Sequence, residues 1–445
     1  MSSTLARSPQ ALIDALRSAG RRRAWLACAP GDPEACAPRA SLPALAPLAR
    51  ALLAEPDYDR HEAVFLEVGP RTGALFGAFL HRTLRGQGQG GLRCWEYATS
   101  GDFLRDGLRL ARGMGRKSAL AGLWWGGGKG VIALPGGARA RDPAWRRLLF
   151  AEYGRFVTGL RGCYVTAEDV GTQPEDMRVL FAHTRYATCV PEDLGGSGNP
   201  APMTAAGVVC AIEAALEWMG EGDLAGKRIA MQGAGNVSAH MVPLLLARGV
   251  AGVVASETSA ERRAALLDHA ADPRLEVRAV AYGDRSILAE PCDVLVPNAL
   301  GGVLDPKTIP ELRARLVCGA ANNLLEDDER DGRALAGRGI PFVPDFIANR
   351  LGIVACCDEH AGRVHPDPRI VAQLGRDDPH SIRHVVQRVL DRARATGETP
   401  VAAANALADA ALREPHPIHG DRSRRIIASL LEGGWAERGP EGSEE

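Results

Sequence analysis

Two lysines and one aspartate occupy settings that suit proton transfer. Lys117 ends the stretch RGMGRK, Lys129 follows three glycines in WWGGGKG, and Asp169 follows a strand-like segment and precedes Gly171. Glycines let a ligand approach the backbone, and a buried ammonium has a lowered pKa suited to proton transfer. A carboxylate at a strand end can take a proton from an amine. Each residue alone could be a solvated charge or a helix cap, but together they predict a catalytic group.

A glycine turn that suits a pyrophosphate lies farther along the chain. The run QGAGNV connects a predicted strand at 228–232 to a predicted helix at 237–247. Such glycines permit a tight turn and close approach of the phosphates, and the helix N-terminus supplies free N–H groups. Ser238 stands where a third glycine is usual, so the turn alone also fits a structural role. We expect its cofactor-binding residues to be Gly233, Gly235, Asn236 and Val237.

An acidic residue ends the next predicted strand. Glu257 follows the strand at 252–256, where a carboxylate can accept a hydrogen bond from a ribose 2′-hydroxyl and repel a 2′-phosphate. This favours NAD over NADP as the cofactor. Arg262 and Arg263 weaken the preference, but we interpret them as solvated helix charges.

Composition limits the classes of protein that remain. The chain has 445 residues, 53 basic against 54 acidic, with 46% hydrophobic residues, which indicates a globular protein of two domains. This balance predicts neither a nucleic-acid nor an anionic-membrane partner, and no apolar run approaches the ~20 residues that span a bilayer. The ten cysteines are scattered without a CxxC pair, which predicts a reducing, cytoplasmic location and no metal site.

The elements that must position these residues fall into two groups. Residues 1–55 are expected to form a helical extension with loops, and GSGNPAPM marks a domain boundary near residue 200. The first group comprises strands at 63–68, 73–83, 131–134 and 164–167, helices at 102–120 and 143–160, and a glycine-rich turn at 86–91. Beyond the boundary, a helix at 204–219 precedes a strand-helix alternation typical of a parallel sheet. Helices at 381–412 are expected to return to the first domain.

Several stretches together carry a resemblance to a known family. In order along the chain they are GLRLARGMGRKSALAGLWWGGGKGVI, YVTAEDVGTQPEDM, GSGNPAPMTAAGV, MQGAGNVSAHMV, CDVLVPNALGG, CGAANNLL and PDFIAN. The sequence resembles the glutamate/leucine/phenylalanine/valine dehydrogenase family, and is most similar to its leucine dehydrogenase branch. The resemblance implies NAD-dependent, reversible oxidative deamination of an L-amino acid, and a homo-oligomer assembled through the first domain.

The resemblance also implies an α/β fold of two domains. Residues 56–200 and 353–445 would form a mixed-sheet domain for substrate binding and oligomerisation. Residues 201–352 would form a Rossmann-type NAD-binding domain, and the C-terminal helices would return to the first domain.

The resemblance assigns a role to each matching position. Lys117 would bind the substrate α-carboxylate, Lys129 would activate the water that attacks the imine, and Asp169 would accept protons from the amino group. Other residues would line the substrate site: Gln89, Gly90, Gly91, Ala167, Ile353 and Cys356. The nicotinamide and its ribose would lie beside Thr204, Asn298, Ala299, Asn322 and Asn323.

The sequence departs from the family pattern at two places near these positions. The family usually has NAGG where this chain has NRLG, with Arg350 and Leu351, and leucine-type members have an apolar residue where this chain has Gln89. A buried amide requires a partner, so we hypothesise a polar or aromatic substrate. Alternatively Gln89 bonds the backbone and Arg350 points to solvent. The segment 362–379 also exceeds the leucine-type pattern.

Two other functions use the same residues. A biosynthetic enzyme could reduce an imine or aminate an unusual 2-oxo acid with this set of groups. A non-catalytic NAD-binding homologue is a further alternative, but it would have no physical need for two buried lysines.

Overall fold

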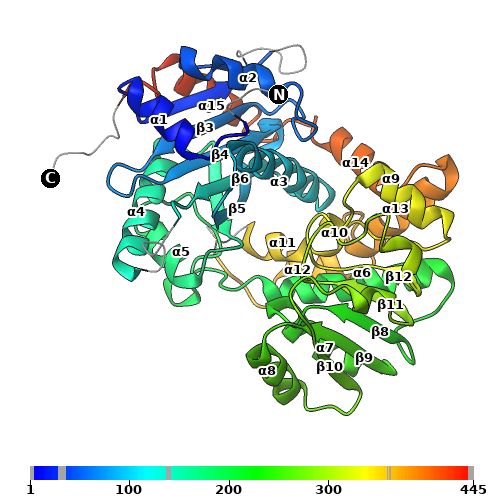
Figure 1. Ribbon diagram of the computed structural model, residues 1–445. Helices are drawn as coiled ribbons and strands as arrows, with labels where there is room; N and C mark the ends of the chain where they lie inside the picture. Colours follow the sequence, from blue (N-terminus) through cyan, green and yellow to red (C-terminus); the bar gives the residue numbers. More distant parts are fainter. Residues whose placement is uncertain (1–4, 29–36, 137–141, 358, 360–361, 439–445) are drawn as a thin grey trace.

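The first domain is built on a seven-stranded mixed sheet. The computed structural model describes residues 5–28, 37–136, 142–357, 359 and 362–438 (Figure 1). The sheet has the order β2-β1-β3-β4-β6-β5-β7, antiparallel from β2 to β6 and parallel across β6, β5 and β7. Its strands are β1 (Arg23–Ala27), β2 (Arg39–Ala40), β3 (Ala63–Val68), β4 (Leu75–His81), β5 (Gly88–Trp95), β6 (Gly126–Ala133) and β7 (Tyr164–Glu168).

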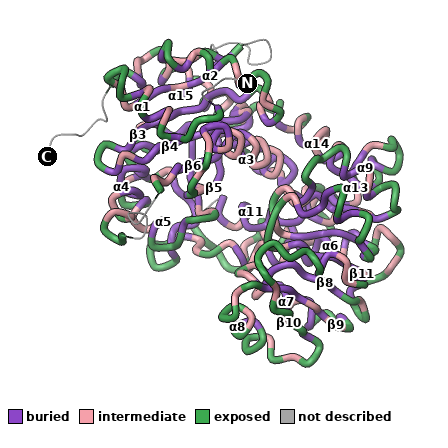
Figure 2. Tube along the Cα trace, in the orientation of Figure 1, coloured by how far each residue is buried: buried purple, intermediate pink, exposed green. Residues whose placement is uncertain are grey.

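Helices cover both faces of this sheet, because successive side chains along each strand point to opposite faces and both faces are apolar. On β3, Val64 and Leu66 pack on one side while Phe65 packs on the other, as a period of two requires. The side of Val64 is covered by α1 (Gln10–Ser18), α2 (Ala46–Leu52) and α3 (Ser100–Leu120). The side of Phe65 is covered by α4 (Pro143–Gly159), α5 (Pro174–Phe181) and α15 (Arg422–Glu432). Figure 2 shows the buried strands between exposed helix faces.

Two segments of this domain differ from the sequence-based expectation. Residues 1–55, expected to be a helical extension, contribute strands β1 and β2, and β1 pairs with β3. The glycine-rich stretch expected as a turn at 86–91 enters strand β5 at Gly88. Its glycines permit close strand packing, because a Cβ at Gly90 would lie 1.8 Å from the carbonyl oxygen of Gly128.

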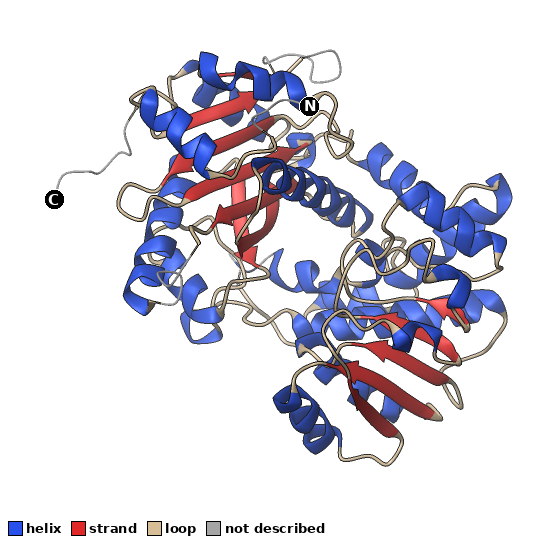
Figure 3. Ribbon diagram, in the orientation of Figure 1, coloured by secondary structure: helices blue, strands red, loops and turns tan. Residues whose placement is uncertain are grey.

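The second domain is a parallel five-stranded sheet with covering helices (Figure 3). Its strand order is β10-β9-β8-β11-β12. Successive strands are therefore added on one side of β8 as far as β10 and then on its other side from β11 to β12. Open α/β sheets bind ligands at such a switch point, here between β8 and β11. The strands are β8 (Arg228–Gln232), β9 (Gly252–Glu257), β10 (Leu275–Ala279), β11 (Cys292–Pro297) and β12 (Ala314–Val317). The helices packed around them include α6 (Ala201–Met219), α7 (Asn236–Ala247), α8 (Ala260–Ala270) and α9 (Asp328–Gly337).

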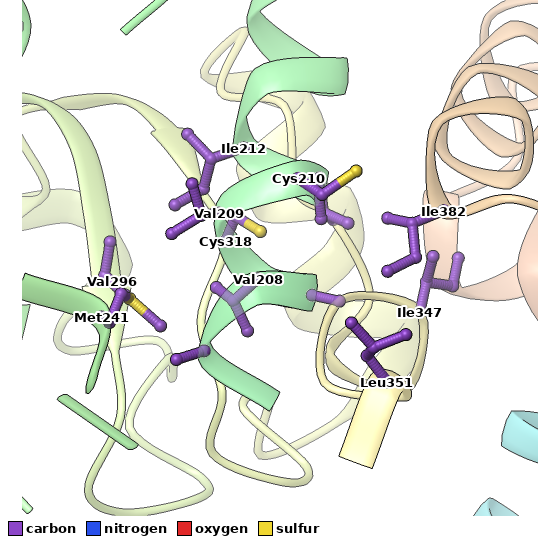
Figure 4. Packing of buried hydrophobic residues seen from close by; sticks show 14 of the residues in the cluster. Val208, Val209, Cys210, Ile212, Met241, Val296, Cys318, Ile347, Leu351 and Ile382 are labelled. Atoms are coloured by element: carbon purple, nitrogen blue, oxygen red, sulfur yellow. The ribbon is translucent and has the colours of Figure 1, made fainter. Parts of the chain in front are cut away.

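Three helices after residue 344 pack on α6: α10 (Asp345–Ala348), α11 (Leu351–Cys357) and α13 (Ile382–Thr396). Figure 4 shows Cys210 of α6 beside Ile382 of α13. Next to them, α12 (Pro368–Leu374) packs on α11 and α13, and α14 (Pro400–Ala411) packs on α13 and on α3 of the first domain. The predicted return to the first domain at 381–412 is therefore wrong for α13 and confirmed for α14. The last helix, α15, packs on the first sheet.

Candidate active site

A lysine-carboxylate pair lies in a cleft between the two domains. Lys129 sits within β6 and Asp169 follows the end of β7, on either side of β5. The Lys129 Nζ lies 2.8 Å from Asp169 Oδ2, and the Lys129 side chain is 3% exposed. The cleft encloses about 220 Å³ and is lined by both residues together with Lys117 and the second-domain residues Asn322 and Asn349.

Burial and neighbouring charges set the protonation of this pair. Burial lowers the pKa of Lys129, partly offset by the Asp169 carboxylate. Burial acts to raise the pKa of Asp169, but the Lys129 and Arg93 cations outweigh it and the pKa lies below its ordinary value. The pair thus supplies an ionised carboxylate and an ammonium that gives up its proton more readily than an exposed lysine.

Lys117 lies at the other side of the same cleft, near the end of α3. Burial lowers its pKa to about 8, while Asp345 at the start of α10 acts against that shift. Burial raises the pKa of Asp345 to about 6, and its Oδ2 accepts a hydrogen bond from the Asn323 backbone N–H at 3.1 Å. A cationic Lys117 facing the cleft is suited to bind a substrate carboxylate.

A mixed polar and apolar pocket adjoins the lysines. Ala167, Ile353 and Cys356 line the cleft as expected, with Cys189 beside them. Gln89 is 1% exposed, and its Nε2 lies 3.4 Å from Thr188 Oγ1. Among the described residues, its Oε1 has no hydrogen-bond partner. A residue that lines the cleft therefore carries a buried acceptor whose bonding capacity is unused among the described residues.

The two glycines expected beside Gln89 have different positions. Gly91 lines the cleft, and a Cβ there would lie 2.7 Å from the Cβ of Asp169. Gly90 instead faces the backbone of Gly128, so its small size serves strand packing.

The glycine turn of the second domain has a shape suited to a dinucleotide. Gly233 has φ +90°, and Gly235 precedes the first residue of α7, so the first N–H groups of α7, which have no carbonyl partner within the helix, lie at the edge of the sheet where β8 ends. Gly233 is followed by Ala234, whose N–H donates to Glu257 Oε2 at 2.9 Å. Hydrogen bonds from Thr258 and Ser259 engage the other oxygen, Oε1. Within the described part of the chain Oε2 accepts this one hydrogen bond, so it can also accept one from a ribose hydroxyl.

Three of the five residues expected beside the nicotinamide line the same cleft, and the other two do not. Thr204, Asn322 and Asn323 line it, and Asn349 donates to Asn322 Oδ1 at 2.9 Å. Among the described residues, Asn349 Oδ1 is buried without a partner and can accept from a carboxamide. Asn298 is tied within the protein by Ser238 and the Ala320 backbone, while Ala299 lines a neighbouring cavity and approaches the position a Gly233 Cβ would take. These groups fit a dinucleotide bound across the parallel sheet.

Several residues in or beside the cleft were not predicted from the sequence. Among them are Arg93, Thr188, Cys189, Asp345 and Asn349. Arg93 follows the double glycine in the motif QGGLR and Asp345 lies in PDFIAN, so motif position could have indicated both. No pattern marks Thr188 and Cys189; only the fold brings Cys189 to the cleft and Thr188 to Gln89.

Arg350 is buried, contrary to the alternative that placed it in solvent. Its side chain is 0% exposed, and its guanidinium donates to the carbonyl oxygens of Leu120 at 2.9 Å and of His380. Burial lowers its pKa to about 9. The residue caps the C-terminal end of α3, where a cation is favoured by the helix dipole.

Comparison with known proteins places these features in one family. Residues 76–186 match the model of the Glu/Leu/Phe/Val dehydrogenase dimerisation domain, and residues 195–420 match that of the glutamate/leucine/phenylalanine/valine dehydrogenases. A leucine dehydrogenase of Geobacillus stearothermophilus is 37% identical over 68% of this chain and 79% of its own. A valine dehydrogenase of Streptomyces coelicolor is 36% identical over 81% of this chain and 94% of its own. The solved structure of an L-tryptophan dehydrogenase from Nostoc punctiforme is 29% identical, covers 82% of this chain and 97% of its own, and has a TM-score of 0.63.

Proposed function

Since the chain belongs to the glutamate/leucine/phenylalanine/valine dehydrogenase family and is an NAD-dependent amino-acid dehydrogenase, we propose how its own residues act on the substrate. The observation that carries the proposal is the contact between Lys129 Nζ and Asp169 Oδ2 inside the cleft that Lys117 also lines. Bound NAD supplies the acceptor for the hydride that leaves the substrate Cα.

Lys117 binds the substrate carboxylate, and this fixes Cα between the first domain and the glycine turn of the second. Asp169 accepts a proton from the substrate ammonium, because its carboxylate is ionised and lies in the cleft. Lys129, whose pKa burial lowers, acts after its ammonium has lost a proton to solvent: the neutral amine takes a proton from the water that adds to the imine carbon, and the ammonium formed stabilises the oxygen as charge develops there. Asp169 returns its proton to the amino group, ammonia leaves and a 2-oxo acid remains; the reverse sequence aminates the 2-oxo acid.

The substrate that best fits this cleft has a side chain with a hydrogen-bond donor, either polar or aromatic. Gln89 Oε1 is buried and unpaired among the described residues, and such an acceptor is costly unless a ligand pairs it. An indole N–H, a phenolic O–H, an amide N–H or a hydroxyl would pair with it. The side chain of leucine or valine leaves it unpaired. The likeness to a tryptophan dehydrogenase is consistent with an aromatic donor.

Oligomer formation is supported by the match to a dimerisation domain at residues 76–186. We expect a closed homo-oligomer assembled through the first domain. Light scattering on the purified protein measures this directly, and the mass of a single chain at micromolar concentration would contradict it.

The proposed chemistry is tested with a panel of L-amino acids and NAD at alkaline pH, following NADH absorbance. We expect turnover of at least one amino acid, reduced by orders of magnitude in Lys129→Ala and in Asp169→Asn. Lys227→Ala is the matched control, because Lys227 forms an ion pair with Glu221 in the second domain and lies outside the cleft. Undiminished activity in Lys129→Ala would refute the role given to that lysine.

A further inference from the structure

A second cation contacts the same carboxylate oxygen that Lys129 contacts. Arg93 Nε lies 3.1 Å from Asp169 Oδ2, and Lys129 Nζ lies 2.8 Å from it. The two cations approach from different sides. Lys129 lines the substrate cleft, whereas Arg93 lines a neighbouring outer cavity together with Tyr97 and Asp106.

Arg93 is held in place on the side away from the cleft. Its terminal nitrogen donates to Asp106 Oδ1 at 3.0 Å and Oδ2 at 3.3 Å, and Tyr97 donates to Asp106 Oδ2 at 2.6 Å. Asp106 lies on α3, the helix that carries Lys117. The guanidinium is therefore fixed between the end of β7 and α3, and its own charge is balanced by two carboxylates.

We infer that Arg93 is a positioning residue that holds the Asp169 carboxylate toward the cleft and ionised while Lys129 acts on the substrate. The inference rests on the proposed roles of Asp169 and Lys129. It extends them, because in those roles alone Lys129 would have to pair with the Asp169 carboxylate and act on the attacking water at the same time.

Asp169 needs a second cation because Lys129 cannot stay paired with it throughout the reaction. When Lys129 turns to the attacking water, Asp169 loses one of its two cations. Burial acts to raise the pKa of this carboxyl, so without Arg93 it would take up a proton and cease to be a base. Arg93 keeps its charge at all working pH values and does not leave.

Other groups around Asp169 do not replace Arg93. The titratable and charged groups that interact with Asp169 come from β6, α3, β5 with the residues that follow it, and β7: Lys129, Lys117, Arg93, Tyr97, Glu168 and Tyr164. Lys117 is committed to the substrate carboxylate in the proposed mechanism. Glu168 is acidic, and burial raises the pKa of Tyr164 well above its ordinary value, which leaves the tyrosine neutral. Arg93 is thus the cation in this set that has no task on the substrate.

The test compares two substitutions at opposite ends of the same contact. In Arg93→Met, the acidic limb of the kcat/KM pH profile is expected to move up by about 1–2 pH units, because a cation beside the carboxylate is lost. In Asp106→Asn, Arg93 keeps its charge and loses a competing anion, so the acidic limb of the profile should stay at the same pH or move to lower pH. Arg93→Lys retains the charge and should keep the limb near its original pH.

The outcomes separate positioning from general structural damage. The inference is wrong if Arg93→Met and Asp106→Asn raise the pH of the acidic limb equally. It is also wrong if the limb lies at the same pH in both Arg93 variants as in Asp106→Asn. Should Arg93→Met fail to fold, Arg93→Gln carries the same test, because it also removes the charge and should raise the pH of the acidic limb relative to Arg93→Lys and Asp106→Asn. Asp169→Asn tests the premise separately from the inference. Full activity in this variant would overturn the proposed role of Asp169 itself, whatever the Arg93 variants show.

Discussion

Replacing Gln89 with leucine is expected to shift the enzyme toward aliphatic amino acids. The Gln89 amide is 1% exposed, its Nε2 makes one long contact of 3.4 Å with Thr188, and its Oε1 has no partner among the described residues. An aliphatic substrate leaves this acceptor buried and unpaired, whereas a donor-bearing side chain pairs it. The substitution removes the acceptor and keeps a side chain of similar volume.

The magnitude follows from the cost of an unsatisfied buried acceptor, about 1–3 kcal/mol. Since 1.4 kcal/mol corresponds to about a tenfold change, the ratio of kcat/KM for leucine to kcat/KM for the best donor-bearing substrate should rise about 5- to 150-fold in Gln89→Leu. The same difference predicts that wild-type enzyme prefers the donor-bearing substrate. Initial rates of NADH formation, measured for both substrates at saturating NAD, give this ratio.

Gln87→Leu is the matched control. Gln87 lies two residues earlier and donates to the Gly162 carbonyl at 2.6 Å, outside the cleft. Its substitution should leave the substrate ratio unchanged. An unchanged ratio in Gln89→Leu, or an equal change in Gln87→Leu, would refute the reasoning, as would wild-type turnover of leucine and valine that matches or exceeds every polar and aromatic amino acid.

Other predictions concern the carboxylate site and the strand packing. Because the pKa of Lys117 is lowered to about 8, its charge is present below that pH and lost above it, so the KM for the amino acid should rise as the pH passes about 8 and stay flat in Lys117→Arg. Asp345→Asn removes a carboxylate that supports the Lys117 charge and should move this rise to lower pH; a KM that is constant through this range in wild type would contradict both expectations. Gly90→Ala should destabilise the fold by about 3 kcal/mol or more in urea unfolding, because its Cβ would overlap the Gly128 carbonyl. Gly113→Ala on α3, where a Cβ meets nothing within 4 Å, should instead be neutral or stabilising, and equal effects of the two substitutions would argue against the packing explanation.

The parts of the fold that were predictable from the sequence are those encoded by neighbouring residues. The segment from β8 through the glycine turn to Glu257 is contiguous, and its strand, turn and helix signals agree with one another. Lys129 and Asp169 could be named from local motifs, but their contact depends on β5 lying between β6 and β7. No periodicity specifies that strand order, and the Arg93 contact was missed for the same reason.

Segments with weak or misleading local signals were placed wrongly. The glycines of β5 reduce the strand signal at the place where close packing requires them. The short strand β1 has the sequence RAWLA, whose alanine, leucine and arginine favour a helix, and only pairing with β3 makes it extended. An amphipathic helix such as α13 reveals that one face is buried but not against which neighbour, so its packing on α6 was not predictable.

The two departures from the family pattern can be separated by where their side chains point. Asn349 and Gly352 line the cleft, yet Arg350 between them does not, because its guanidinium turns away to the carbonyls of Leu120 and His380. Its bulk therefore occupies the junction between the domains rather than the substrate pocket. Gln89 lines the cleft, and its buried acceptor has no partner among the residues that the structure describes. Of the two departures, the difference in substrate choice is expected to come from Gln89, while Arg350 fixes the end of the helix on which Lys117 lies.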